Sequence, residues 1–260
     1  MTRLLPALVP AFVPALALSV GLAAPVVAQE FSLSDMSEEQ TAAFGAAVRA
    51  YLLENPEVIM EAVAVLETRQ AEEQVANDAA LVTANYSAIF EDPMSHVGGN
   101  PDGDVTFVEF VDYKCGYCRK AFPELKALME ADGNIRLILK EFPILGEESL
   151  LAARFAVSAK LIGGDAVYGP LHDEMMLMRG NMTEDSLVAL ADDLGFDGAA
   201  YLEGMSDPQV NAVLSDNHAL ASRLQISGTP TFVVGEQLVR GYVPLDAMTD
   251  LVADLRDQAN

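Results

Sequence analysis

The two cysteines of this 260-residue chain stand three positions apart, in a Cys-Gly-Tyr-Cys sequence at residues 115–118. The strongly apolar run 105–111 precedes them and predicts a buried β-strand, whereas residues 119–131 have helical character. A second strand-like run covers residues 135–142, so the cysteines lie at the strand-to-helix junction of a predicted β-α-β unit. A disulfide at this spacing closes too small a loop to staple a fold. We therefore expect the cysteines to serve reactivity.

The position of the cysteines at the start of a helix predicts their roles. The first turn of a helix carries unpaired N–H groups and a partial positive charge, and both stabilise a thiolate. We expect Cys115 to be the attacking sulfur and Cys118 to be the resolving thiol. Half of a zinc site is a poor alternative, because zinc prefers four ligands and the sequence has no second cysteine pair. Copper(I) binding by the two thiolates, in a metal-binding or adaptor protein, remains an alternative.

Another group of side chains that metals favour surrounds His172. It contains four methionines, which are Met175, Met176, Met178 and Met182. Their helical spacing assigns most of them to a core or to a substrate-facing surface. We therefore predict no metal site there, and we predict no cofactor for the chain.

The remaining pattern predicts an α/β domain with a helical insertion. The glycine-rich run at residues 98–103 is typical of a loop, and residues 147–224 are typical of a set of helices. Two short strands at 231–234 and 238–243 form a predicted hairpin, and a closing helix follows at 245–255. We place this domain at residues 91–260, with the insertion at about 147–224.

The amino-terminal residues predict export. Residues 1–28 hold one arginine followed by an uncharged apolar stretch, with small residues before Gln29. This pattern indicates a secretory signal peptide cleaved near Ala28. An uncleaved membrane anchor is the alternative. The net charge of −24 repels nucleic-acid phosphates, so we predict no nucleic-acid partner.

Residues 29–90 predict a helical segment. Ser37 and Gln40 fit a capping box, and a single long helix is expected at residues 56–90. The apolar residues of the segment lie at helical spacing and form a narrow stripe, made by Phe44, Val48, Tyr51 and Leu52, then by Ile59, Val63 and Leu66, and, after a polar stretch at 67–80, by Leu81, Val82, Tyr86, Ile89 and Phe90. A helix with a narrow stripe cannot form a core alone. We favour self-association of this segment, and packing against its own domain is the alternative.

The redox motif and its surroundings resemble the DsbA/DsbC group of bacterial thiol–disulfide oxidoreductases. The resemblance rests on Phe-Val-Asp-Tyr-Lys-Cys-Gly-Tyr-Cys at residues 110–118 and Gly-Thr-Pro-Thr-Phe at 228–232. It implies an α/β thioredoxin-like fold with an inserted helical domain, preceded here by the amino-terminal helical segment. It also implies that Pro230 is a cis-proline facing the cysteines, and that the Thr229 backbone pairs with an extended substrate segment.

The same resemblance assigns roles to residues around the cysteines. It marks Glu109 as a buried acid whose raised pKa lets it relay protons to Cys118. The alternative for Glu109 is an acid at a strand edge, paired with a lysine such as Lys140. Gly116 and Tyr117 are expected to tune the site. The flanking residues Asp112 and Lys114 are expected to tune its charge or to lie in solvent.

The helical appendage, with Asn-Pro-Glu-Val-Ile at residues 55–59, resembles the ScsC proteins, in which it makes trimers. The Gly-Tyr dipeptide and Thr229 resemble the isomerase DsbC, whereas the insertion and Glu109 resemble DsbA. The motif lacks the histidine of DsbA, which argues against a strongly oxidising potential. We predict an oligomeric, by preference trimeric, disulfide isomerase or reductase of the bacterial periplasm. A DsbA-like dithiol oxidase is the alternative.

This prediction also names partners. The substrates would be unfolded or misfolded exported proteins that contain cysteines. A membrane redox protein would reset the cysteine pair after each cycle, because an isomerase has to be kept reduced and an oxidase has to be kept oxidised.

Overall fold

The computed structural model of the chain describes residues 36–259. The predicted signal peptide, residues 1–28, lies outside the described residues. The chain divides into two compact units, residues 1–62 and residues 63–260. In the part of the chain that the structure describes, no helix has the length and apolar character needed to cross a membrane.

In the first unit, helix α1 (Glu38–Glu54) is followed by the start of α2 (Glu57–Ala84). The predicted capping box is confirmed, because the Gln40 N–H donates to the Ser37 hydroxyl at 3.2 Å and the Ser37 N–H donates to the Gln40 side chain at 2.9 Å. No side chain of α1 is buried within the described residues. The part of the predicted apolar stripe that lies on α1 is therefore exposed to solvent, with Phe44 46% exposed and Tyr51 57% exposed.

In the second unit, the end of α2 is separated from the short helix α3 (Tyr86–Phe90), so the prediction of one helix over 56–90 is wrong. The break lies at Asn85, whose side-chain amide donates to the carbonyl oxygen of Leu81 at 2.9 Å. A short polar side chain that bonds the nearby backbone in this way competes with helix propagation. Beyond the break, Ile89 and Phe90 are buried in the core of the unit. This part of the predicted helical segment thus packs against its own domain.

A five-stranded sheet forms the centre of the second unit, in the order β1-β3-β2-β4-β5. The strands are β1 (His96–Gly99), β2 (Val105–Val111), β3 (Ile135–Glu141), β4 (Thr231–Val234) and β5 (Gln237–Arg240). The β2 strand is central, parallel to β3 and antiparallel to β4. The predicted loop at 98–103 includes the end of β1. That strand is held by hydrogen bonds to β3, which is distant in the sequence.

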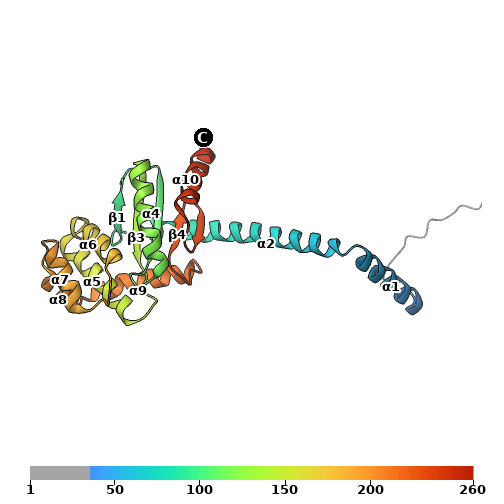
Figure 1. The fold of residues 1–260 in the computed structure, drawn as a ribbon, viewed down its shortest axis with the longest axis horizontal. Coiled ribbons are helices and arrows are strands. Elements are labelled where there is room, and N and C mark those ends of the chain that lie inside the picture. The colour runs from blue at the N-terminus through green and yellow to red at the C-terminus, as the bar shows by residue number, and fades with distance from the viewer. Residues whose placement is uncertain (1–35, 260) are drawn as a thin grey trace, which may run out of the picture. The chain divides into compact units, whose positions relative to one another are not determined.

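Helices cover both faces of the sheet, because side chains alternate between the faces along each strand. Phe107 and Leu139 point to the face covered by α4 (Gly116–Asp132) and α10 (Leu245–Ala259). Val108 and Ile138 point to the opposite face, where they pack with α3 and the end of α9 (Pro208–Arg223). Figure 1 shows α4 running along the strands of the sheet.

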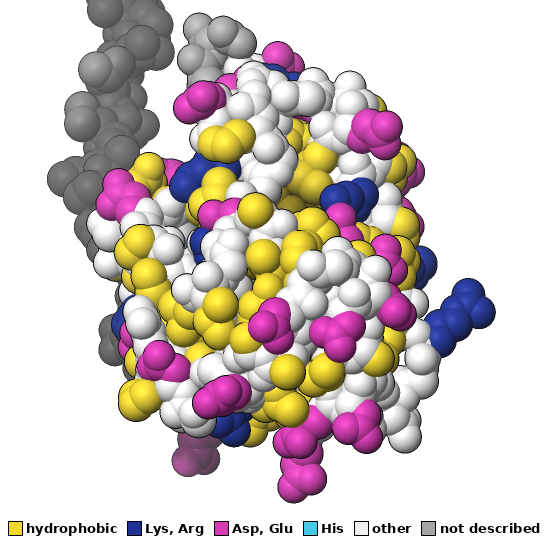
Figure 2. Space-filling model, turned by 90° about the vertical axis from the view of Figure 1, so that its left-hand side faces the viewer, with side chains coloured by type: hydrophobic (Ala, Val, Ile, Leu, Met, Phe, Trp, Pro, Cys, Tyr) yellow, Lys and Arg dark blue, Asp and Glu magenta, His cyan; other side chains and the backbone are white. Residues whose placement is uncertain are grey.

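The predicted insertion is confirmed as a group of five helices between β3 and β4. They are α5 (Glu147–Gly163), α6 (Asp165–Leu177), α7 (Glu184–Asp193), α8 (Gly198–Gly204) and α9. In Figure 1, α5 to α8 gather at one end of the sheet. In Figure 2, the visible face of the molecule carries acidic side chains scattered among apolar ones. The sheet covered by helices, with five helices inserted between β3 and β4, confirms the predicted α/β thioredoxin-like architecture with a helical insertion.

Candidate active site

The cysteine pair lies at the junction between β2 and α4. Cys115 is the N-cap residue of α4, and its sulfur accepts the backbone N–H of Cys118 at 3.4 Å. The Cys115 thiol donates to the backbone carbonyl oxygen of Thr229 at 3.2 Å. Both cysteines are free thiols, and Cys118, in the first turn of α4, is fully buried. The Cys115 sulfur thus bonds one amide that has no partner within the helix and one carbonyl from a distant loop.

The loop that carries Thr229 is placed by the sheet. The antiparallel register pairs Thr231 with Phe110, so the residues before β4 lie beside the turn that follows β2. The Thr229–Pro230 peptide bond is cis. The Thr231 hydroxyl donates to the Gly228 carbonyl at 2.8 Å and fixes the loop from within. The structure therefore brings both residues of the predicted substrate-binding loop next to Cys115.

The two residues between the cysteines lie at the surface. Tyr117 is 63% exposed, and its ring stacks on Tyr242 at a centroid distance of 6.2 Å. Gly116 is also exposed, and a Cβ atom there would meet no heavy atom within 4 Å. The Tyr117 side chain and the backbone of Gly116 are therefore accessible from solvent beside the cysteines.

Asp112 does not lie in solvent, although that was one of its two expected positions. It is 1% exposed, and its carboxylate accepts the backbone N–H groups of Lys114 at 2.8 Å, Ile144 at 2.8 Å and Leu145 at 3.1 Å. Backbone donors satisfy the buried carboxylate in this way. Asp112 therefore ties the active-site turn, which is residues 112–115 between β2 and α4, to residues 144–145, of which Leu145 is largely exposed.

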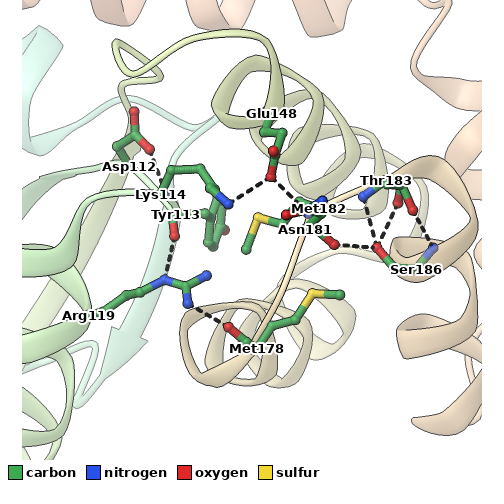
Figure 3. A network of polar contacts seen from close by, with 10 residues as sticks. All are labelled: Asp112, Tyr113, Lys114, Arg119, Glu148, Met178, Asn181, Met182, Thr183 and Ser186. Carbon is green, nitrogen blue, oxygen red and sulfur yellow. Dashed lines mark hydrogen bonds and ion pairs between the residues drawn. The ribbon is translucent and has the colours of Figure 1, made fainter.

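Two cations, Lys114 before α4 and Arg119 in its first turns, connect this region to the helical insertion. The Lys114 ammonium donates to Glu148 of α5 at 2.7 Å, and that carboxylate also accepts the Met182 N–H at 3.0 Å. Arg119 donates to the carbonyl of Tyr113 at 2.7 Å and to the carbonyl of Met178. Figure 3 shows these bonds converging from the turn on the loop that joins α6 to α7. Our sequence analysis did not identify Arg119, because the loop it binds is distant in sequence.

Glu109 lies on β2 beneath the cysteines and is 3% exposed. Its Oε1 atom has no hydrogen-bond partner among residues 36–259. Burial raises the pKa of Glu109 to about 8, and the charge of Glu141 adds to this effect. Burial also raises the pKa of Cys118, with a further contribution from Glu109. Glu109 and Cys118 therefore lie close enough to influence each other's ionisation.

The suggested pairing of Glu109 with Lys140 is wrong. Lys140 lies next to Glu141 on β3, so it points to the opposite face of the sheet from Glu109. Its ammonium donates to Asp92 at 2.7 Å and to the Ala88 carbonyl at 2.8 Å. A buried ammonium needs such partners, and here they all come from the segment around α3.

A small cavity of about 70 Å³ reaches Glu109 from the side of the sheet. Its lining includes His96 and Gly98 of β1, Lys126 of α4, and His172 and Asp173 of α6. Lys126 and Asp173 form an exposed ion pair at 2.7 Å. Apolar side chains line most of the cavity, but its volume and the polar groups in its lining leave room for water. Water there could reach the unpartnered carboxyl of Glu109.

Glu141 is a second buried acid, which our sequence analysis did not identify. Its Oε1 atom accepts the hydroxyl of Tyr113 at 2.7 Å and the hydroxyl of Tyr168 at 2.5 Å. The Tyr113 hydroxyl also lies 3.0 Å from Nδ1 of His172. Burial raises the pKa of Glu141 to about 8 and lowers that of His172 to about 3. The sequence feature that could have identified Glu141 is the presence of an acid near the end of the predicted strand 135–142.

The methionines near His172 belong to the packed interior. Met175, Met176 and Met182 are buried in the main core, with Met178 packed against it. Within residues 36–259, no three His, Cys, Asp or Glu side chains gather in a way that could hold a metal ion.

Two segments of the chain match known protein families. Residues 106–253 match the family described as DSBA-like thioredoxin domain. Residues 40–73 match the family described as copper resistance protein ScsC N-terminal domain. The first match spans more than half of the chain and contains the cysteine pair and the Thr229–Pro230 loop.

Solved structures agree with this placement. A thioredoxin-like oxidoreductase from Silicibacter pomeroyi DSS-3 is 42% identical, with a TM-score of 0.62, and the match covers 66% of this chain and 97% of that chain. Proteus mirabilis ScsC in a transitional conformation is 26% identical, with a TM-score of 0.62, and the match covers 86% of this chain and 98% of that chain.

Among curated sequences, the Na(+)/H(+) antiporter NhaA 1 of Salinispora arenicola is 27% identical over 157 residues, which are 60% of this chain and 24% of that protein. The chain thus spans about a quarter of the length of the first curated relatives that it matches. The chain belongs to the DSBA-like thioredoxin domain family, carries an ScsC N-terminal domain, and has the Cys-x-x-Cys pair of thiol–disulfide oxidoreductases of the DsbA and ScsC kind.

Proposed function

We propose that this protein is an oligomeric protein-disulfide isomerase or reductase that acts on misfolded exported proteins. The observation that carries the proposal is the geometry of Cys115, which caps α4 and faces the carbonyl of Thr229. A sulfur at a helix start is suited to act as a thiolate, because helix N–H groups and the helix dipole favour the negative charge.

The reaction begins with attack of the Cys115 thiolate on one sulfur of a client disulfide. A bond forms between Cys115 and that sulfur, and the second client sulfur leaves as a thiolate that takes a proton from water. In isomerisation, another client thiolate attacks the same client sulfur and releases Cys115. In reduction, Cys118 attacks Cys115, and its proton passes to Glu109 in the fraction of molecules in which that carboxyl is ionised. The client sulfur leaves as a thiolate that takes a proton from water, so both client thiols are reduced.

The surface around Cys115 supports a client that is partly unfolded. Tyr117, Ile144 and Leu145 are exposed, and the last two are held by Asp112 beside the active-site turn. Exposed apolar side chains at a site of this kind suit contact with apolar segments that a misfolded protein exposes. The Thr229 backbone would pair with an extended client segment, as in other cases of strand addition.

The amino-terminal unit supports an assembly of several copies, with a trimer as the preferred size. Its apolar stripe is exposed, and its sequence matches the ScsC N-terminal domain. Several active sites that surround one client raise the local thiol concentration, which favours repeated exchange over a single reaction. In this proposal residues 29–90 form the oligomerisation segment, apart from Ile89 and Phe90, which pack in the core of the catalytic domain, and residues 91–260 form the rest of that domain. Residues 1–28 direct export to the periplasm, and a membrane redox protein resets the cysteines.

The experiment is reactivation of scrambled ribonuclease by the reduced protein. We expect reactivation by the wild type, none by Cys115→Ala, and weak reactivation by the double variant Phe44→Glu/Tyr51→Glu. The matched control is Ala46→Glu, which adds a charge on the opposite side of α1. A DsbA-like oxidase would instead oxidise reduced ribonuclease rapidly and leave the scrambled form inactive, and that result would overturn the isomerase proposal.

A further inference from the structure

We propose that Glu141 is a positioning residue of the active site, which anchors the active-site turn through Tyr113 and keeps the shared proton of two buried acids on Glu109. This inference rests on the proposed exchange reaction at Cys118, and it assigns a role to the second-last residue of the predicted strand 135–142.

The register of the sheet places the two acids on one face. In the parallel pair of β2 and β3, Glu109 lies opposite Leu139. Glu141 is two residues further along β3, so its side chain points to the same face as that of Glu109. Each is 3% exposed, and the charge of Glu141 acts on Glu109. Two carboxyl groups buried so close together disfavour double ionisation.

The hydrogen bonds decide which acid carries the charge. Glu141 accepts two phenol hydroxyls on Oε1, although its Oε2 is buried without a partner, whereas Oε1 of Glu109 has no partner among the described residues and no hydroxyl donates to that carboxyl. Hydrogen bonds donated to a carboxylate stabilise its charged form. Burial raises the pKa of both acids. When the pair loses its first proton, the negative charge therefore belongs on Glu141 and the remaining proton belongs on Glu109.

The remaining bond of Tyr113 fixes the state of His172. The single hydroxyl proton of Tyr113 is donated to Glu141, so the contact at 3.0 Å requires that Nδ1 of His172 carries a proton and donates to the phenol oxygen. Burial lowers the pKa of His172 to about 3, which leaves the ring neutral. The imidazole thus orients Tyr113 and supplies no positive charge to the acids.

Other titratable groups also face the two acids, and none is a buried cation. They are Cys118 of α4, Asp112 and Tyr113 of the active-site turn, Tyr168 and His172 of α6, and His96 of β1, with the ion pair Lys126–Asp173 at the side of the cavity. A cation that would neutralise both acids is therefore not present among the described groups that line this cluster.

A proton held on Glu109 favours the reduced cysteine pair. When a thiolate of a dithiol reductant attacks Cys115 in the oxidised protein, a new S–S bond forms and the bond between Cys115 and Cys118 breaks. Cys118 leaves as a thiolate and takes the proton of Glu109. Glu109 then regains a proton from water in the adjoining cavity. This direction serves an isomerase, which works from the reduced state.

The test is a carboxyl ¹³C NMR titration of Glu109 in the full chain, with its resonance identified by its loss in Glu109→Gln. In Glu141→Gln the amide oxygen still accepts the phenols but the charge is gone. We expect the midpoint of Glu109 to fall by about one pH unit and to stay above its ordinary value, since burial remains and only the repulsion from Glu141 is removed. The matched control Glu130→Gln removes a charge from the exposed side of α4 and leaves the midpoint unchanged.

A second variant protects the test against a folding defect in Glu141→Gln. Tyr168→Phe keeps both acids and removes one donor from Glu141, so Glu141 holds more of the proton and the midpoint of Glu109 falls. The rate at which dithiothreitol reduces the oxidised protein should fall about threefold at pH 7.5 in Glu141→Gln, and its pH profile should move to lower pH. An unchanged midpoint in both variants overturns the inference. The titration needs no client, so its result is independent of the proposed isomerase activity.

Discussion

The thiol of Cys115 lies 3.2 Å from the backbone carbonyl oxygen of Thr229, although the two residues are 114 positions apart in the chain. The contact joins the end of β2 to the loop before β4 and defines one edge of the site. A client sulfur bound to Cys115 would therefore lie beside the backbone of Thr229, where an extended peptide can pair with it. Proton transfer to and from Cys118 depends on the buried acids Glu109 and Glu141. The exposed surface beside the site depends on Asp112, which holds residues 144–145.

Glu109 makes the protein less stable as the pH rises, because its pKa is raised from 4.5 to about 8 in the folded state. Below about pH 4.5 the carboxyl is protonated in both the folded and unfolded states, so its contribution is fully favourable there. Stability is lost as the pH rises through 8, because the unfolded state releases the proton more readily. We expect Glu109→Gln to increase the free energy of unfolding at pH 8 by on the order of 1–3 kcal/mol, and by far less at pH 4.5.

Urea unfolding of the reduced protein at the two pH values measures this difference. The control Glu130→Gln should show no such dependence on pH, because Glu130 is exposed. An equal effect of Glu109→Gln at both pH values would contradict a raised pKa for Glu109.

Asp112 should be important for stability. Asp112→Ala leaves three backbone N–H groups without their acceptor, those of Lys114, Ile144 and Leu145. We expect the free energy of unfolding to fall by about 2–4 kcal/mol, since each lost bond to a carboxylate is worth more than a neutral one. Asp193→Ala, at an exposed position of α7, is the control and should change stability by less than about 0.5 kcal/mol. Equal stability of the two variants would show that the Asp112 bonds are not significant.

The exposed stripe of α1 should hold copies of the chain together. Phe44→Glu/Tyr51→Glu places two charges on this stripe, and we expect the double variant to elute as a monomer in size-exclusion chromatography with light scattering. Ala46→Glu should retain the oligomer of the wild type. If the double variant and the control have the same mass, the stripe is not the contact between copies.

The central part of the fold could be predicted from the sequence because its patterns are local. The strands 105–111 and 231–234 have the predicted bounds, and the helical insertion lies where the glycine and proline pattern placed it. The strand β1 could not be predicted in the same way. It ends in two glycines and is held by pairing with β3, which depends on residues about forty positions away.

The site shows a similar division. The positions of Cys115 and Thr229 follow from motifs, and Glu109 is conspicuous on an apolar strand. Glu141 depends on the register between β2 and β3, which the sequence does not reveal. The proposed pairing of Glu109 with Lys140 failed for the same reason, because adjacent residues of a strand point to opposite faces.

The most direct test of the proposed mechanism is to trap the mixed disulfide between this protein and a client with scrambled disulfides. The reduced variants Cys118→Ser and Cys115→Ser are each mixed with the client, quenched in acid and analysed by mass spectrometry. If Cys115 attacks and Cys118 resolves, Cys118→Ser accumulates one client per chain, bound through Cys115, and Cys115→Ser accumulates none. Adducts through Cys118 in Cys115→Ser that form as fast as those of the other variant would contradict the mechanism.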